Sequence, residues 1–227
     1  MFRIAGSGRV YDVAMMTRRR FLPAAAAAAA LAPQIGRSQD AAKWMNPVKK
    51  LLSEGKPVIG CTITTSSVDA AAQAANMGYD FLWIEMEHSP ITLETARSMV
   101  LATRGLKAMP FIRVPVNELW TAKRALDAGA MGVIFPFTST PELARQAVAA
   151  CKYPPVGKRG AGPALATFRW SGPESYYDLA DRNAMVIAII EESRAVDKID
   201  EIASTPGIDV LFIGTNDLSF SLGHRGD

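Results

Sequence analysis

Short apolar runs alternate with longer amphipathic segments along the chain from residue 57 onward. The apolar runs predict strands at residues 57–63, 81–87, 109–114, 132–137, 185–190 and 210–214, with a further short strand within 158–170. Segments with apolar residues every three or four positions predict helices from a cap at Ser66 or Ser67 to Gly78, over 92–103, 118–128 and 196–203, and from Thr140 onward. Strands without a polar face are typical of parallel sheets, and their alternation with helices predicts an α/β fold.

The number of these units favours a (β/α)8 barrel over a dinucleotide-binding fold. Seven strand–helix units are predicted, and no G-x-G-x-x-G motif follows the first strand. In a barrel of this kind, the C-terminal ends of the strands form the active face. Polar residues gather at those predicted ends, and they are Glu85, Glu87, His88, Arg113, Glu191, Asn216 and Asp217. We therefore take these side chains as the candidates for chemistry.

The N-terminal residues 1–32 have the pattern of a twin-arginine (Tat) signal peptide with an upstream extension. Residues 17–22 read T-R-R-R-F-L, and an apolar run rich in alanine follows at residues 24–32. This run is shorter than the roughly 20 residues that span a bilayer, so no stable membrane insertion is expected. The alternative is a basic, Ala-rich helix at the N-terminus of a cytoplasmic protein. We predict a periplasmic or secreted protein, cytoplasmic if the signal is not used, with an N-terminal segment at 33–56 and the barrel domain at 57–227.

The net charge of +3 belongs to this N-terminal region. Residues 1–32 hold five arginines and one aspartate, so the rest of the chain is slightly acidic. A nucleic-acid partner is therefore not expected. The chain has two cysteines, Cys61 and Cys151, which are too few for a disulfide framework and are interpreted as small buried residues. With two histidines, it also lacks the motifs of His-rich metal sites.

Two carboxylates at neighbouring strand ends, Glu191 and Asp217, predict a site for Mg²⁺ or Mn²⁺. Such cations are commonly held by one or two carboxylates, with water and substrate oxygens completing the shell. The alternatives are an ordinary loop acid at Glu191 and a helix cap at Asp217. We favour the metal site because the two residues occupy matching positions.

Three further positions suggest acid–base or anion-binding chemistry. His88 has the pKa range needed to move a proton near neutral pH, and an adjacent acid could orient it. Arg113 would bind a carboxylate or a developing oxyanion in the barrel mouth, or would form a salt bridge with Glu85 or Glu87. The turn at Arg159 and Gly160 could present backbone N–H groups to an anion, although Gly-rich turns are common.

Several stretches occur together that resemble the HpcH/HpaI aldolase/citrate lyase family, the metal-dependent class II 2-oxoacid aldolases. The similarity extends from about Gly55 to Gly223. It rests on W-I-E-M-E-H at 83–88, R-V-P at 113–115, L-D-A-G-A at 126–130, Y-P-P-x-G-x-R-G at 153–160, I-E at 190–191 and F-I-G-T-N-D-L-S at 212–219.

This resemblance implies roles for individual residues and a reaction. It implies Glu191 and Asp217 as ligands of Mg²⁺, Mn²⁺ or Co²⁺, catalytic His88 paired with Asp127, and Arg113 as a catalytic and substrate-binding residue. Further substrate contacts are expected at Gly214, Thr215, Asn216, Arg159 and Gly160. The implied reaction cleaves or forms a 4-hydroxy-2-oxoacid from a small 2-oxoacid and an aldehyde, through a metal-stabilised pyruvate enolate. The implied assembly is a homo-oligomer, a hexamer with exchanged C-terminal helices, built from (β/α)8 barrels of the phosphoenolpyruvate/pyruvate type.

The chain also departs from the family pattern. Glu85 stands where the family commonly has Asp, and Thr215 where it commonly has Pro. The chain ends shortly after the last predicted strand, so we expect the eighth strand and the last helices of the barrel to be missing. The alternatives to an aldolase are an exported 2-oxoacid-binding protein without catalysis and a related acyl-CoA lyase.

Overall fold

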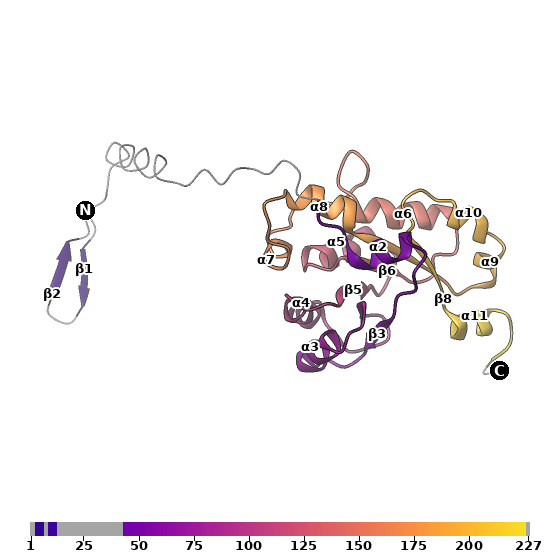
Figure 1. Ribbon diagram of the computed structural model, residues 1–227, viewed down its shortest axis with the longest axis horizontal. Coiled ribbons are helices and arrows are strands. Elements are labelled where there is room, and N and C mark those ends of the chain that lie inside the picture. Colours follow the sequence, from indigo (N-terminus) through magenta and orange to yellow (C-terminus); the bar gives the residue numbers. More distant parts are fainter. Residues whose placement is uncertain (1–2, 7–8, 13–42, 226–227) are drawn as a thin grey trace. The chain divides into compact units, whose positions relative to one another are not determined.

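A computed structural model describes residues 3–6, 9–12 and 43–225 (Figure 1). The chain divides into two compact units, Met1–Lys43 and Trp44–Asp227. In the first unit, β1 (Arg3–Gly6) pairs antiparallel with β2 (Arg9–Asp12), a hairpin that the sequence pattern did not predict. The predicted twin-arginine motif and alanine run lie outside the described residues.

The second unit is built on a sheet of six parallel strands. They are β3 (Gly60–Ile63), β4 (Phe81–Glu85), β5 (Met109–Arg113), β6 (Gly132–Phe135), β7 (Met185–Ile190) and β8 (Val210–Ile213). Each strand pairs with the next one in the chain, so the order never reverses as it does in a doubly wound sheet. The sheet is a curled part of a (β/α)8 barrel, which confirms the predicted fold class.

The predicted number of strands was wrong by one within the described residues. The segment 158–170, where a short strand was expected, contains the helix α7 (Ala166–Arg169) and no strand. Pairing leaves no room for one, because β6 pairs directly with β7 from Gly132 opposite Met185 to Phe135 opposite Ala188. The physical reason is composition, since glycine, proline and alanine dominate residues 160–166 and offer no run of β-branched side chains.

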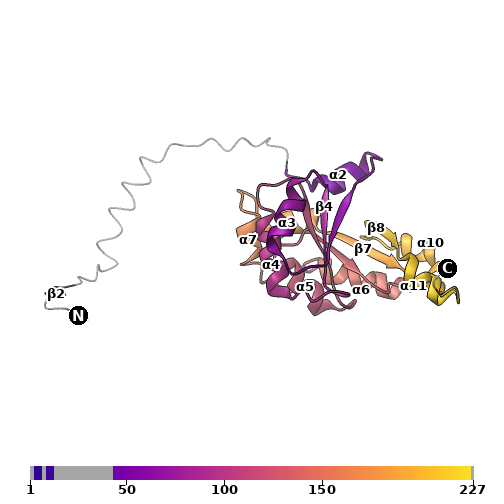
Figure 2. The ribbon, with the colours of Figure 1, turned by 90° about the horizontal axis from the view of Figure 1, so that it is seen from below.

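The helices that connect the strands cover one side of the sheet (Figure 2), whereas Val48 of the helix before β3 packs on the other side. Three begin with side-chain caps: α3 (Val68–Asn76) at Ser67, one of the two predicted cap positions, α4 (Leu93–Ala102) at Thr92 and α6 (Pro141–Cys151) at Thr140. The others are α2 (Pro47–Ser53), α5 (Leu119–Asp127), α8 (Tyr176–Asn183), α9 (Ser193–Val196), α10 (Ile199–Ala203) and α11 (Thr215–Ser221). No helix within the described ranges is long and apolar enough to cross a membrane.

The two faces of the sheet have separate apolar clusters, because successive side chains of a strand point to opposite faces. Leu82, Ile84 and Ile112 pack with the helices on the outer side. Trp83 and Phe111 belong to the inner cluster, together with Met109, Ile134, Met185, Ile187 and Ile189. This alternation decides which residues beyond the strands face the interior of the barrel.

Candidate active site

Three charged residues follow the inner apolar cluster on the same face of the sheet, each two positions further along its strand. Counting two residues on from Trp83, Phe111 and Ile189 gives Glu85, Arg113 and Glu191. Glu85 and Arg113 are paired in the register of β4 and β5, and Glu191 directly follows β7. The period of the strands therefore brings two carboxylates and one guanidinium to the same edge of the barrel interior.

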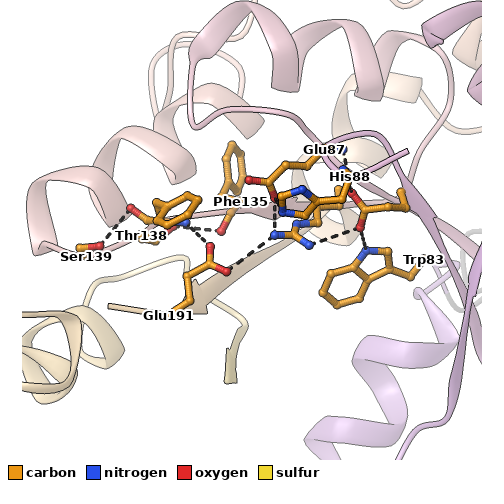
Figure 3. Close-up of polar contacts among 10 residues, drawn as sticks. Trp83, Glu87, His88, Phe135, Thr138, Ser139 and Glu191 are labelled. Atoms are coloured by element: carbon orange, nitrogen blue, oxygen red, sulfur yellow. Dashed lines mark hydrogen bonds and ion pairs between the residues drawn. The ribbon is translucent and has the colours of Figure 1, made fainter. Parts of the chain in front are cut away.

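Arg113 connects the acidic residues of this edge (Figure 3). Its Nη1 lies 3.4 Å from Oε2 of Glu85, and its Nη2 lies 3.6 Å from Oε2 of Glu191. Nη2 also forms an ion pair with Oε2 of Glu87. The salt bridges considered for Arg113 from the sequence are thus both present. Its role toward a substrate stays a prediction.

The turn after β4 is organised by the buried carboxylate of Glu85. One oxygen, Oε1, accepts hydrogen bonds from the backbone N–H groups of Glu87 at 2.7 Å and His88 at 3.0 Å. The other, Oε2, accepts one from the indole Nε1 of Trp83 at 2.9 Å. Burial alone would raise the pKa of Glu85, but these hydrogen bonds and the charge of Arg113 hold it below its ordinary value. Glu85 is therefore ionised at neutral pH.

Glu191 is almost completely buried, with 2% of its surface exposed. Its Oε1 accepts a hydrogen bond from the backbone N–H of Phe137 at 2.6 Å (Figure 3). Phe137 itself has φ of 49°, in the left-handed region that non-glycine residues rarely adopt. Burial raises the pKa of Glu191, against the effects of Phe137 and Arg113, and the charge of Asp217 raises it further.

Asp217 lies half-buried in the first turn of α11, beside the same space. The N-cap of this helix is Gly214, so the alternative role of Asp217 as its cap is wrong. Gly214 also packs against Glu191, the other predicted metal ligand. A Cβ at position 214 would lie 2.9 Å from Oε2 of Glu191. Position 214 requires glycine because of this close approach.

A pocket of about 250 Å³ joins these groups. Among its lining residues are seven of the predicted site residues: His88, Arg113, Glu191, Gly214, Thr215, Asn216 and Asp217. The remaining wall is apolar and is made by Trp83, Ile189, Phe212 and Ile213. The pocket thus combines polar groups with an apolar wall, as small-molecule sites commonly do.

The donor set of this pocket fits a hard divalent cation. Within the described part of the chain, no group of three or more His, Cys, Asp or Glu side chains is placed to hold a metal ion. Glu191 and Asp217 instead supply two carboxylates beside open space, and the charge of Asp217 adds to the effect of burial in raising the pKa of Glu191. Mg²⁺ is typically bound by one or two carboxylates, with water and substrate oxygens as the other ligands.

Asp127, Arg159 and Gly160 are not among the residues that line this pocket. Asp127 ends α5 and accepts a hydrogen bond from Nη2 of Arg159 at 2.8 Å. Arg159 is 1% exposed, and its guanidinium lies 4.5 Å from the ring centre of Tyr153. Among the described contacts, no hydrogen bond or ion pair joins Asp127 to His88. The pairing of Asp127 with His88 and the substrate contacts of Arg159 and Gly160 stay predictions.

The neighbour that His88 does have is Glu87. Nε2 of His88 lies 3.7 Å from Oε2 of Glu87, and 62% of the His88 side chain is exposed. The adjacent acid expected from the sequence context thus lies near the imidazole, and its role in orienting the ring stays a prediction.

Two contributors to the site were not predicted from the sequence as parts of it. They are the indole of Trp83 and the backbone N–H of Phe137. Strand alternation could have indicated Trp83, because it lies two residues before Glu85. Nothing in the sequence marks Phe137 as a left-handed residue.

Comparison with known proteins shows the family. The profile of the HpcH/HpaI aldolase/citrate lyase family matches residues 59–227. The chain belongs to this family. It is 37% identical over 183 residues to a hydroxypyruvate/pyruvate aldolase of Roseobacter denitrificans, a match that covers 80% of this chain and 72% of that protein. A 5-keto-4-deoxy-D-glucarate aldolase of Shigella sonnei is 35% identical over 182 residues, covering 80% of this chain and 71% of the relative.

The fold agrees with solved structures of the HpcH/HpaI family. A family member from Burkholderia cenocepacia superimposes with a TM-score of 0.74 and 38% identity, covering 81% of this chain and 74% of the other. Family membership supports an enzyme of the aldolase type. The pocket described above lies at the strand ends where barrel enzymes hold their active sites.

Proposed function

We propose that this protein is a divalent-metal-dependent aldolase that cleaves or forms a 4-hydroxy-2-oxoacid, with a small 2-oxoacid such as pyruvate as one product or reactant. The observation that carries the proposal is the convergence of Glu191, Asp217, Arg113 and His88 on one small pocket. The names of the relatives support it, since both a hydroxypyruvate/pyruvate aldolase and a 5-keto-4-deoxy-D-glucarate aldolase act in aldol chemistry.

Glu191 and Asp217 would hold the cation in this proposal. A bound divalent cation would supply Lewis-acid stabilisation of the negative charge that develops on the keto oxygen of a 2-oxoacid. Arg113 would bind an oxygen of the same substrate, because its guanidinium lines the pocket with a direction fixed by Glu85 and Glu87. Glu191 itself is buried, which limits the water around its carboxylate.

His88 would move the proton on the C4 hydroxyl of the aldol. Its imidazole lines the pocket and is largely exposed, so it can reach a substrate that enters from solvent. The contact with Glu87 would restrict the orientation of the ring. In cleavage, His88 would take this proton as the C3–C4 bond breaks, and in condensation it would return it.

The test is a pyruvate-release assay on the purified full chain with a panel of 4-hydroxy-2-oxoacids. We expect turnover with Mg²⁺, Mn²⁺ or Co²⁺, loss of turnover in EDTA, and recovery when the metal is returned. Glu191→Gln should lose about 100-fold or more in kcat/KM, while Glu142→Gln, an exposed control on α6, should not change it.

Two outcomes would contradict the proposal. Turnover that survives both EDTA and Glu191→Ala would refute the role of the metal. Binding of pyruvate without turnover in any of the three metals would instead favour an exported binding protein.

A further inference from the structure

Glu85 is surrounded by more hydrogen-bond donors than any other acid described in the site. Its two carboxylate oxygens face the N–H groups of Glu87 and His88, the indole of Trp83 and the guanidinium of Arg113. The side chain is buried, with 4% of the residue exposed, so water cannot replace these partners freely. An ionised carboxylate has about four lone-pair directions for acceptance and no proton to donate. Every one of its acceptor positions is therefore used.

We propose that Glu85 is the positioning residue of the site, which fixes the direction of the Arg113 guanidinium and the place of His88 together. This inference rests on the proposed function, in which Arg113 binds the 2-oxoacid and His88 moves the proton. Glu85 itself touches neither substrate nor metal in this scheme. It acts through the two residues that it holds.

The contact with Arg113 determines which edge of the guanidinium is free. Nη1 is engaged by Glu85 at 3.4 Å, and Nη2 faces Glu87 and Glu191. The guanidinium also lies 6.0 Å from the ring centre of Trp83, whose indole N–H is bound to the same Glu85 oxygen. Trp83 and Glu85 thus both lie against the Arg113 guanidinium and limit its direction, while Arg113 also lines the pocket.

The contact with His88 is made through the backbone. The imidazole is 62% exposed, so packing does not hold it in place. Its backbone N–H is bound to Oε1 of Glu85 at 3.0 Å, and the hydroxyl of Ser89 contacts the backbone carbonyl oxygen of Glu85. The turn that carries His88 is therefore closed onto Glu85 from both sides.

A glutamine of the same shape cannot do this work. It has one acceptor oxygen, and its NH₂ group would have to face either two backbone N–H groups or the indole and guanidinium donors. Aspartate keeps the charge and both acceptors but is one methylene shorter, so it reaches fewer partners. The inference therefore predicts an order of function in which Glu exceeds Asp and Asp exceeds Gln.

The experiment compares Glu85→Gln, Glu85→Asp and Trp83→Phe with the wild-type full chain, with Glu142→Gln as the matched exposed control. The readouts are kcat and KM with pyruvate as product, the affinity for oxalate with Mg²⁺ measured by calorimetry, and NMR of the His88 amide, the Arg113 side chain and the Trp83 indole. We expect Glu85→Gln to lower kcat/KM by about 100-fold and oxalate affinity by about tenfold.

In Glu85→Asp, kcat/KM and oxalate affinity should lie between those of the wild type and those of Glu85→Gln. Trp83→Phe should lower kcat/KM about threefold. The NMR signals of His88 and Arg113 should move in Glu85→Gln and stay in place in the control. If the wild type lacks turnover while these signals move, the proposed function fails and the positioning role stands.

Unmoved signals in Glu85→Gln, or oxalate affinity and kcat/KM within about threefold of wild type, would overturn the positioning role. If Glu85→Gln does not fold, wild-type kinetics and spectra in both Glu85→Asp and Trp83→Phe would overturn it equally.

Discussion

Around Arg113, negative charges outnumber positive ones. Glu85, Glu87 and Glu191 all contact this one guanidinium, and the charge of Asp217 acts on Glu191 as well. A cluster of like charges in a partly buried site is costly unless a cation completes it. A divalent cation between Glu191 and Asp217 would balance this excess, which is the residue-scale reason for the proposed metal.

The first prediction concerns the glycine that touches Glu191. A methyl group at position 214 would come within 2.8 Å of Cβ and 2.9 Å of Oε2 of Glu191, so Gly214→Ala must displace that carboxylate. We expect the affinity for Mn²⁺ and kcat/KM to fall by about tenfold or more. Gly172→Ala is the control, because a Cβ there meets no atom within 4 Å. Equal metal affinity in the two variants would show that Glu191 does not bind the cation.

The second prediction is a dependence of stability on pH. Burial raises the pKa of Glu87, against the effects of Arg113 and His88, and the charges of Glu191 and Glu85 raise it further. The folded state therefore holds the Glu87 proton more tightly than the unfolded state does. As pH rises from the unfolded pKa to the folded pKa, the free energy of unfolding decreases. From about pH 4 to pH 7 the thermal midpoint of wild type should fall relative to that of Glu87→Gln. A constant difference between the two midpoints would be inconsistent with a raised pKa.

At the scale of residues, strand periodicity predicted most of the site. Polar residues at strand ends identified Glu191, Asp217, Arg113 and His88, and the pocket brings these together. What the sequence could not show was the donor set around Glu85, because a backbone N–H or an indole carries no marker of its partner. The left-handed backbone of Phe137 could not be predicted either, because phenylalanine rarely adopts this conformation.

Among the elements, α11 determines where Asp217 lies. This helix is tied back to the segment after Glu191, since the backbone N–H of Ser193 donates to Oγ of Ser221 at 2.9 Å. The two hydroxyl groups are also 3.2 Å apart. The connection links the two carboxylates of the proposed metal site through the backbone on either side.

The third prediction tests this connection. Ser221→Ala removes the acceptor for the Ser193 N–H, so we expect Mn²⁺ affinity to fall about threefold to tenfold. The thermal midpoint should change little because the contact is exposed and water can replace it. Ser221→Thr keeps the hydroxyl and serves as the control. If calorimetry finds the same Mn²⁺ affinity in Ser221→Ala and Ser221→Thr, the contact between Ser193 and Ser221 does not position Asp217 for the cation.

Element prediction succeeded where caps and periodicity agreed. Ser67, Thr92 and Thr140 each lie at the predicted start of a helix, and each accepts a backbone hydrogen bond as its cap. The predicted helix over 196–203 is two short helices, α9 and α10, with Asp197–Lys198 between them.

The helices α2 and α8 were missed, as was the β1–β2 hairpin. In α8, the buried residues Leu179 and Ala180 stand between polar residues such as Asp178 and Arg182, so the sequence shows no clear apolar periodicity.

At the scale of the whole molecule, strand order follows chain order, so every strand end contributes to one edge. The site draws on β4, β5, β7, β8 and α11, which span much of the second unit's sequence. Occupation of the site should therefore stabilise the second unit as a whole. Ligands that bind only the folded state raise its stability according to their affinity and concentration.

The fourth prediction follows from this coupling. Mn²⁺ at about 100 times its dissociation constant should add about 2.7 kcal/mol and raise the thermal midpoint by roughly 5–10 °C. Asp217→Asn should abolish most of this rise, while Glu142→Gln should retain it. A rise of the same size in Asp217→Asn would mean that the cation binds elsewhere.

The most direct test of the central claim is exchange of the pyruvate methyl protons with solvent deuterium, followed by proton NMR in the presence of Mg²⁺. This exchange reports proton removal from C3 without requiring the aldehyde partner to be known. We predict exchange by the wild-type chain that stops in EDTA and falls by about 100-fold or more in Glu191→Gln and Arg113→Lys. Exchange no faster than in protein-free buffer, or exchange unchanged in Glu191→Gln, would contradict the proposed metal-dependent aldolase.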